Sequence, residues 1–136
     1  MGVLRLNLAR LATGLLVIST AFGQGMGPQP DSAKVRTARQ ALGLAKELAA
    51  TAKNVSLTAN WEIGYLEAWL GELDQGLATI CSVEDPDNAG RLDALFRTGH
   101  DIGARGQIEA VATASAKLRG ADRAWLLAGL AEAQFE

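Results

Sequence analysis

The side chains best suited to covalent chemistry are the single cysteine, Cys81, and the single histidine, His100. A thiol and an imidazole can form a nucleophile and its base, but these two could meet only through the fold. No oxyanion-hole motif or third catalytic member accompanies them. We expect Asp101 to lie on a different helical side from His100, because adjacent positions point about 100° apart. The sequence therefore predicts no catalytic residue, a partly exposed structural histidine, and a buried cysteine with nothing adjacent to lower its pKa.

A second candidate is the acidic stretch just before residue 90. Asp85, Asp87 and Gly90 match the first, third and sixth positions of a calcium-binding loop. Ala89 and Phe96 stand where that loop requires oxygen ligands. A zinc site would need more histidine and cysteine ligands than the chain contains. We therefore expect no metal and no cofactor, and we assign these acids to helix capping.

Composition and charge narrow the class of protein. The 136 residues suffice for one domain, and 49% of them are hydrophobic while only 5% are aromatic. Alanine and leucine dominate and β-branched residues are scarce, which favours helices over strands. The formal charge of −2, without a basic stripe, argues against a nucleic-acid surface. The predicted fold class is all-α.

The N-terminus has the pattern of a targeting signal. Arg5 and Arg10 precede an apolar run from Leu11 to Phe22, and small residues lead to a cleavage point after Gly23. The run is shorter than the roughly 20 residues needed to cross a bilayer, which disfavours an uncleaved anchor. We expect a signal peptide over residues 1–23, export to the periplasm or medium, and no stable membrane span after cleavage.

The remainder divides into a tether and a helical domain. Residues 24–34, rich in glycine and proline at their start, are expected to form a disordered tether. Residues 35–136 are expected to form the helical domain, with the first helix capped by Asp31 or Ser32. Apolar positions at helical spacing predict six helices that form three antiparallel pairs. They cover about 32–52, 57–72, 73–84, 88–103, 107–118 (closed by Gly120) and 121–136.

One predicted helix carries large aromatic side chains along one side. Trp61, Tyr65 and Trp69 follow one another at intervals of four. Such a stripe either packs against neighbouring helices or forms an exposed ligand surface. We favour burial, because aromatic side chains supply the largest area available to a small core.

Glycine spacing reveals an internal period. Gly64 and Gly71 lie seven residues apart, and Gly99 and Gly106 repeat that interval 35 positions later. The segment that begins at Gly71 is echoed by the segment that begins at Gly106. A period in the mid-thirties with two helices per unit is typical of helical solenoids. We expect Gly64 and Gly99 to mark close contacts between helices.

At these positions the chain resembles the tetratricopeptide family of helical repeats. The resemblance lies in Trp61, Ile63, Gly64, Gly71 and the closing Pro86-Asp87-Asn88, and it covers about residues 35–136. It departs from the family where Gly76 replaces the usual alanine and where the second unit lacks a closing proline. The resemblance implies a short α-α solenoid that binds other proteins.

By chain order the last predicted helix pairs with the fifth, but in the register of the glycine period it begins a unit and lacks the second helix of that unit. Its large apolar side chains spread over more than one helical side, which predicts an exposed strip after the helix packs on the fifth one. We expect this strip to mediate self-association or to dock a helix of a partner protein. Its candidate binding residues are Trp125, Leu126, Leu127, Leu130 and Phe135.

The sequence thus predicts an exported, non-enzymatic protein-protein interaction module. Two alternatives stay open, namely a small exported enzyme that uses carboxylate chemistry and a fragment of a longer repeat array. A pocket with two converging carboxylates of perturbed pKa would favour the enzyme. A shallow groove with scattered polar side chains would favour the module.

Overall fold

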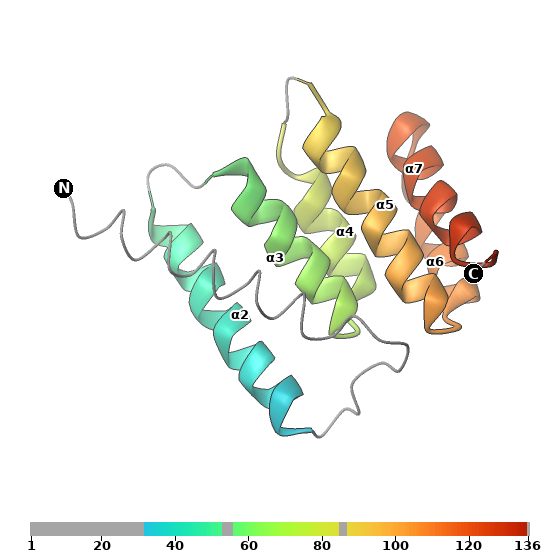
Figure 1. Ribbon diagram of the computed structural model, residues 1–136. Helices are drawn as coiled ribbons and strands as arrows, with labels where there is room; N and C mark the ends of the chain where they lie inside the picture. Colours follow the sequence, from blue (N-terminus) through green and yellow to red (C-terminus); the bar gives the residue numbers. More distant parts are fainter. Residues whose placement is uncertain (1–31, 53–55, 85–86, 136) are drawn as a thin grey trace. The chain divides into compact units, whose positions relative to one another are not determined.

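The computed structural model describes residues 32–52, 56–84 and 87–135, and six helices occupy most of them (Figure 1). No strand occurs within these described ranges, so the all-α class is confirmed. The predicted signal peptide and most of the predicted tether lie outside them. The helices are α2 (Ala33–Thr51), α3 (Leu57–Trp69), α4 (Leu73–Cys81), α5 (Ala89–Ala104), α6 (Ile108–Ser115) and α7 (Gly120–Glu132).

The chain divides into a unit that ends at Ala52 and a unit that begins at Lys53, and α2 belongs to the first. Ser32 caps α2, because its hydroxyl accepts a hydrogen bond of 3.2 Å from the backbone N–H of Val35. The helix begins at Ala33, so the expected tether boundary at residue 34 lies two residues too late. The single domain expected over 35–136 stays a prediction.

The second unit begins with two hairpins whose turns have the same construction. Gly71 and Gly106, 35 residues apart, have φ angles of 104° and 79°. Each glycine N–H donates to the carbonyl three residues earlier, and the N–H of the next residue, Glu72 or Gln107, donates to the carbonyl five residues earlier. These bonds satisfy the last helical carbonyls, and the left-handed backbone favours glycine. The predicted period is therefore present in the turns.

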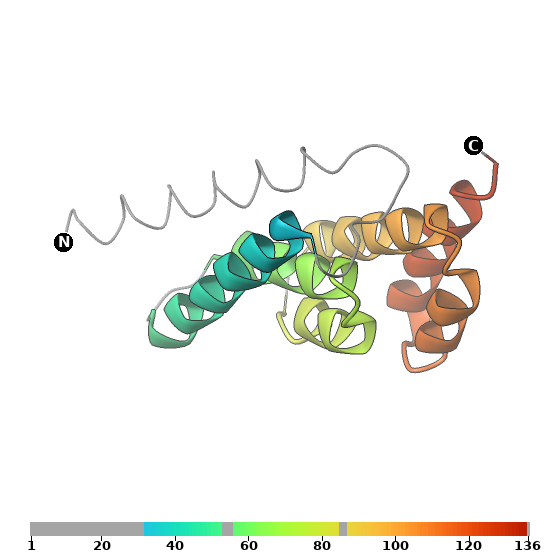
Figure 2. The same ribbon diagram turned by 90° about the horizontal axis from the view of Figure 1, so that it is seen from below.

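The helices of this unit run in two alternating directions. In Figure 1, α3, α5 and α7 descend while α4 and α6 return. Figure 2 shows α4 and α6 on the same side of α3 and α5. Polar contacts between α3 and α5 join residues 35 or 36 positions apart, as two parallel helices of successive hairpins require. The fully buried centre of the unit holds Ile80, Leu95, Ile102, Val111 and Leu126.

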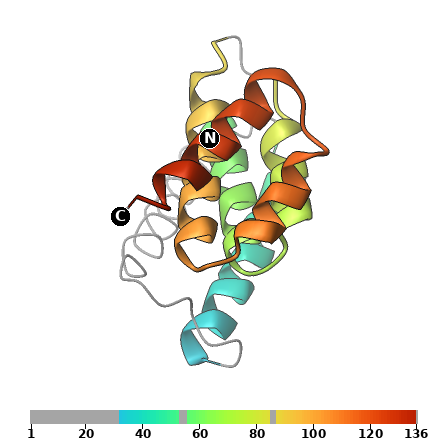
Figure 3. The same cartoon turned by 90° about the vertical axis from the view of Figure 1, so that its right-hand side faces the viewer.

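Glycines set the closest approaches between these helices. A Cβ atom on Gly64 would lie 2.6 Å from the carbonyl oxygen of Gly76 in α4. A Cβ atom on Gly99 would lie 2.0 Å from the carbonyl oxygen of Leu126 in α7, which crosses over α5 in Figure 3. The expectation of close contacts at Gly64 and Gly99 is confirmed. Their partners differ, since Gly64 meets the other helix of its own hairpin and Gly99 meets the next parallel helix.

Several helix ends differ from the prediction. The helix α4 ends at Cys81, and α6 ends at Ser115 instead of Leu118. Beyond Ser115 the next three N–H groups bond to carbonyls three residues earlier, a tighter turn that ends the α-helix. Gly120, with φ of 55°, is the first residue of α7, so its assignment as the cap of the preceding helix was wrong.

We predict that Gly99→Ala destabilises the protein far more than Gly103→Ala, one turn further along α5. The new methyl group at residue 99 meets a backbone carbonyl that cannot move independently, which typically costs about 1–3 kcal/mol or more. At residue 103 the nearest atom is the flexible Cδ1 of Leu130, at 2.7 Å, and helix propensity compensates by up to about 1 kcal/mol. Chemical denaturation measures both variants. Equal stabilities would contradict the close approach at Gly99.

Candidate functional site

An open groove of about 590 Å³ lies between the beginning of α4 and one face of α6. Its lining combines small and apolar side chains with charged ones. Leu73 is half-buried and Ala114 is buried, whereas Ala110 is exposed. The groove is lined by Gly71, Glu72, Leu73, Asp74, Gln75, Glu109, Ala110, Thr113, Ala114 and Lys117.

Charged side chains surround this apolar floor. Glu72, Asp74 and Glu109 supply three exposed carboxylates, and Lys117 supplies the only cation among the described residues that line the groove. The Nζ atom of Lys117 lies 2.6 Å from Oδ2 of Asp74, and both side chains are 63% exposed. Asp74 and Glu109 lie in the first turns of α4 and α6, where a carboxylate complements the positive end of a helix.

The two first-turn acids occupy equivalent places in the two hairpins. Each lies three residues beyond the turn glycine, Asp74 after Gly71 and Glu109 after Gly106. The repeated segments are visible in the sequence, but nothing in it predicts that the two acids share a site. Because the turns have the same hydrogen bonds, the repeat brings both carboxylates to the same groove.

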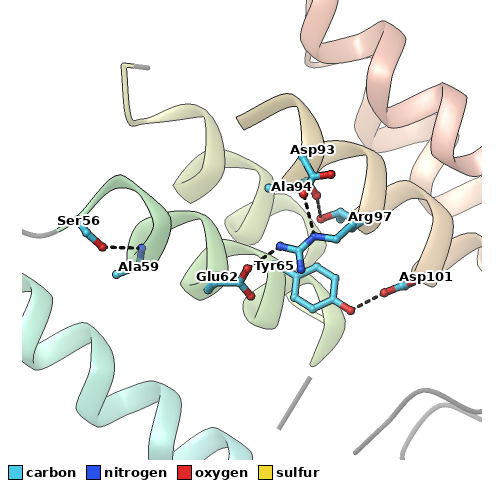
Figure 4. A network of polar contacts seen from close by, with 9 residues as sticks. Ser56, Ala59, Glu62, Tyr65, Asp93, Ala94, Arg97 and Asp101 are labelled. Carbon is cyan, nitrogen blue, oxygen red and sulfur yellow. Dashed lines mark hydrogen bonds and ion pairs between the residues drawn. The ribbon is translucent and has the colours of Figure 1, made fainter. Parts of the chain in front are cut away.

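A second polar feature joins α3 to α5 (Figure 4). The Nη2 atom of Arg97 donates to Oε1 of Glu62 at 2.7 Å, and its Nε atom lies 3.4 Å from Oδ2 of Asp93. The Arg97 guanidinium lies 4.8 Å from the centre of the Tyr65 ring. The Tyr65 hydroxyl donates to Oδ2 of Asp101. This cluster ties the two parallel helices together through charge-assisted contacts.

The environment of this cluster shifts two pKa values. Burial, and next the hydrogen bond and charge of Asp101, raise the pKa of Tyr65 far above its usual 10.0. Burial tends to lower the pKa of Arg97, but the hydrogen bond and charge of Glu62 raise it overall. Tyr65 therefore remains a hydrogen-bond donor, and Arg97 remains a cation, throughout the physiological range.

Arg105 lies over the ring of Trp69, which follows Tyr65 by one turn of α3. Its guanidinium carbon is 3.6 Å from the ring centre, and its Nη1 atom donates to the Trp69 carbonyl at 2.8 Å. Tyr65 and Trp69 are buried, which confirms the expectation for these members of the aromatic stripe. Trp61 is half-buried, and a Cβ atom on Gly90 would lie 2.0 Å from its ring. The stripe belongs to the core of the protein.

The two candidates for nucleophilic chemistry have separate surroundings. The Nδ1 atom of partly exposed His100 lies 2.9 Å from Oδ1 of Asp101, so the two neighbours are in contact although adjacent positions point about 100° apart. Burial, and next the charge of Asp122 partly offset by Arg91, raise the pKa of half-buried Cys81 to about 11. The charged groups that act on Cys81 are thus Asp122 and Arg91, whereas His100 contacts Asp101.

The predicted C-terminal strip is partly in the core. Leu126 is 0% exposed and Leu130 only 7%, so these two candidate residues lie in the core and not on an exposed strip. The reason is that α7 packs chiefly on α5, which covers this side. Leu127 is half-buried against the core, whereas Trp125 is 45% exposed and Phe135, beyond the end of α7, is 90% exposed.

A fully buried carboxylate was not predicted from the sequence. Glu67 is 0% exposed, and the hydroxyl of Thr79 in α4 donates to its Oε2 atom at 2.5 Å. The available signal was spacing, because Glu67 lies four positions after the buried Ile63 and on the same side of α3. Glu67 and Thr79 link the two helices of the first hairpin.

Comparisons with protein-family models, with curated proteins and with solved structures gave no match. Within the described ranges, no three histidine, cysteine, aspartate or glutamate side chains gather closely enough to hold a metal ion. None of the helices in that part of the chain combines the length and apolar character that crossing a membrane demands.

We predict that Tyr65 stays protonated in the folded protein at pH values where an ordinary tyrosine ionises. It is the only tyrosine, so the absorbance of tyrosinate reports this residue alone. Unfolding in denaturant should restore the titration midpoint of this tyrosine to about pH 10. Asp101→Asn should lower the folded midpoint but leave it above 10.0, since burial remains the largest cause. A folded protein that titrates at the ordinary midpoint would contradict the buried contact.

We predict that Cys81 reacts slowly with a disulfide reagent, because only the thiolate attacks. A rise of its pKa from 9.0 to about 11 reduces the thiolate fraction at pH 8 about 100-fold relative to the unfolded chain. Asp122→Asn should accelerate the reaction, since it removes a nearby negative charge and leaves Arg91. Asp74→Asn is the control and should have no effect. A rate that levels off below pH 9 would exclude a raised pKa.

Proposed function

We propose that this chain is an exported, non-enzymatic protein-interaction module that binds a polypeptide in the groove between α4 and α6. The observation that carries the proposal is the groove itself, an open surface with an apolar floor and a polar rim. Its two equivalent acids, Asp74 and Glu109, come from corresponding positions of successive hairpins. Surfaces assembled from corresponding residues of stacked hairpins are the usual binding sites of helical repeats.

We infer further that the second unit is a short tetratricopeptide-like solenoid. The turns at Gly71 and Gly106 have the same hydrogen bonds, which supports this inference. The contacting residues of α3 and α5 are 35 or 36 positions apart, close to one repeat. The helices α4 and α6 also lie on the same side of α3 and α5. The crossing of α7 directly over α5 marks where the array departs from a regular third hairpin.

The arrangement of the carboxylates favours binding over acid-base catalysis. A catalytic acid at neutral pH needs a carboxyl shielded from water, whereas the three acids of the groove are exposed. Asp74 is already paired with Lys117, and Asp101 is engaged by both Tyr65 and His100. The interaction module is therefore the better account of this surface.

Site-specific photo-cross-linking tests the proposal in the cells that make the protein. A photoreactive amino acid at exposed Gln75, inside the groove, should give a discrete adduct with another polypeptide. The same amino acid at Ala128, exposed on α7 outside the groove, is the matched control and should give none. Absence of an adduct at position 75, or equal adducts at both positions, would refute binding in the groove.

A further inference from the structure

The inference concerns the chemistry of the groove's occupant, and it rests on the proposed interaction function. The floor has room for an apolar group, because Ala110 and Ala114 present only methyl groups beside half-buried Leu73. An aliphatic side chain placed there would remove apolar area from water on both partners. A groove of this kind selects an amphipathic segment, with one apolar side chain toward the floor and polar side chains toward the rim and the solvent.

The charges around this floor determine which polar side chains fit best. Three carboxylates and one ammonium group line the groove, so its net charge is negative. Asp74 is compensated by Lys117, whereas Glu72 and Glu109 have no ion pair among the described residues. A partner with lysine or arginine on either side of its apolar residue would complement both of these carboxylates.

The ion pair between Lys117 and Asp74 indicates how a basic partner would bind. The Lys117 ammonium lies 2.6 Å from a groove carboxylate, the position that a partner's lysine or arginine could take. Both side chains are largely exposed, so the pair is weak and readily exchanged. Lys117 is thus an internal competitor whose removal would free Asp74 and make the groove more negative.

We propose that the groove between α4 and α6 binds a basic amphipathic segment of a partner polypeptide. Its apolar side chain lies on Leu73, Ala110 and Ala114, while its cationic side chains pair with the carboxylates at the rim. The segment displaces Lys117 from Asp74 when it binds.

Binding of three synthetic helical peptides to the full chain tests this proposal. The peptides share the same leucine and alanine positions, and their polar positions are all lysine, all glutamine or all glutamate. Fluorescence anisotropy should show the tightest binding for the lysine peptide, and the affinity should fall as salt is added. Glu72→Gln and Glu109→Gln should each weaken its binding by about 2–5-fold, as expected for exposed ion pairs. Lys117→Gln should strengthen it.

Two further variants separate specific binding from general attraction. Glu132→Gln removes the same charge from α7 outside the groove and should leave the affinity unchanged. Ala110→Leu fills the floor without changing the charge and should abolish binding. Equal losses for Glu132→Gln and Glu109→Gln, or weaker binding by Lys117→Gln, would overturn the proposal.

The outcomes also distinguish this inference from the function on which it rests. Tighter binding of the glutamine or glutamate peptide, blocked by Ala110→Leu, would overturn the basic partner but retain the interaction module. If none of the three peptides binds but position 75 still gives an adduct, the basic partner is likewise overturned and the interaction module is retained. Failure of the peptides and of the cross-link would overturn both.

Discussion

Backbone contact between α5 and α7 is the constraint on which the C-terminal half of this protein depends. A Cβ atom on Gly99 would lie 2.0 Å from the Leu126 carbonyl oxygen, and one on Gly129 would lie 2.0 Å from the Phe96 carbonyl oxygen. A backbone carbonyl of the opposite helix thus lies directly against each glycine. The two helices can approach this closely only because both lack a side chain at the crossing. Leu126 is carried into the centre of the unit as a consequence.

This crossing also explains why the groove lies at α4 and α6 and not on α7. With α7 held against α5, Leu126 and Leu130 complete the core, and the large exposed apolar side chains among the described residues of this segment are Trp125 and Phe135. The short α6 ends at Ser115, and the tight turn that follows holds Lys117 beside Asp74. The first turns of α4 and α6 remain uncovered within the unit, which gives the groove its open side.

Much of the fold could be predicted from the sequence, because its signals are local. Ser32 and Ser56 cap helices through bonds to the third following N–H, and Gly71 and Gly106 adopt the positive φ that glycine favours. The core position of Leu126 could not be predicted in this way. It depends on the pairing of Gly99 with a glycine 30 residues later, and helical spacing within one segment carries no information on that pairing.

The polar cluster between α3 and α5 fixes how these helices align along their length. Glu62 meets Arg97, Tyr65 meets Asp101, and Trp69 meets Arg105, each at an offset of 35 or 36 residues. Sliding α5 by one turn would move every partner by about 5.4 Å and separate all three pairs together. An apolar interface would tolerate such a slide, because hydrophobic contacts are not directional. The hydroxyl of buried Tyr65 would lose its partner away from water, and the half-buried guanidinium groups would lose their charge-assisted contacts. The same alignment keeps the two hairpins one repeat apart, and so holds Asp74 and Glu109 at one groove.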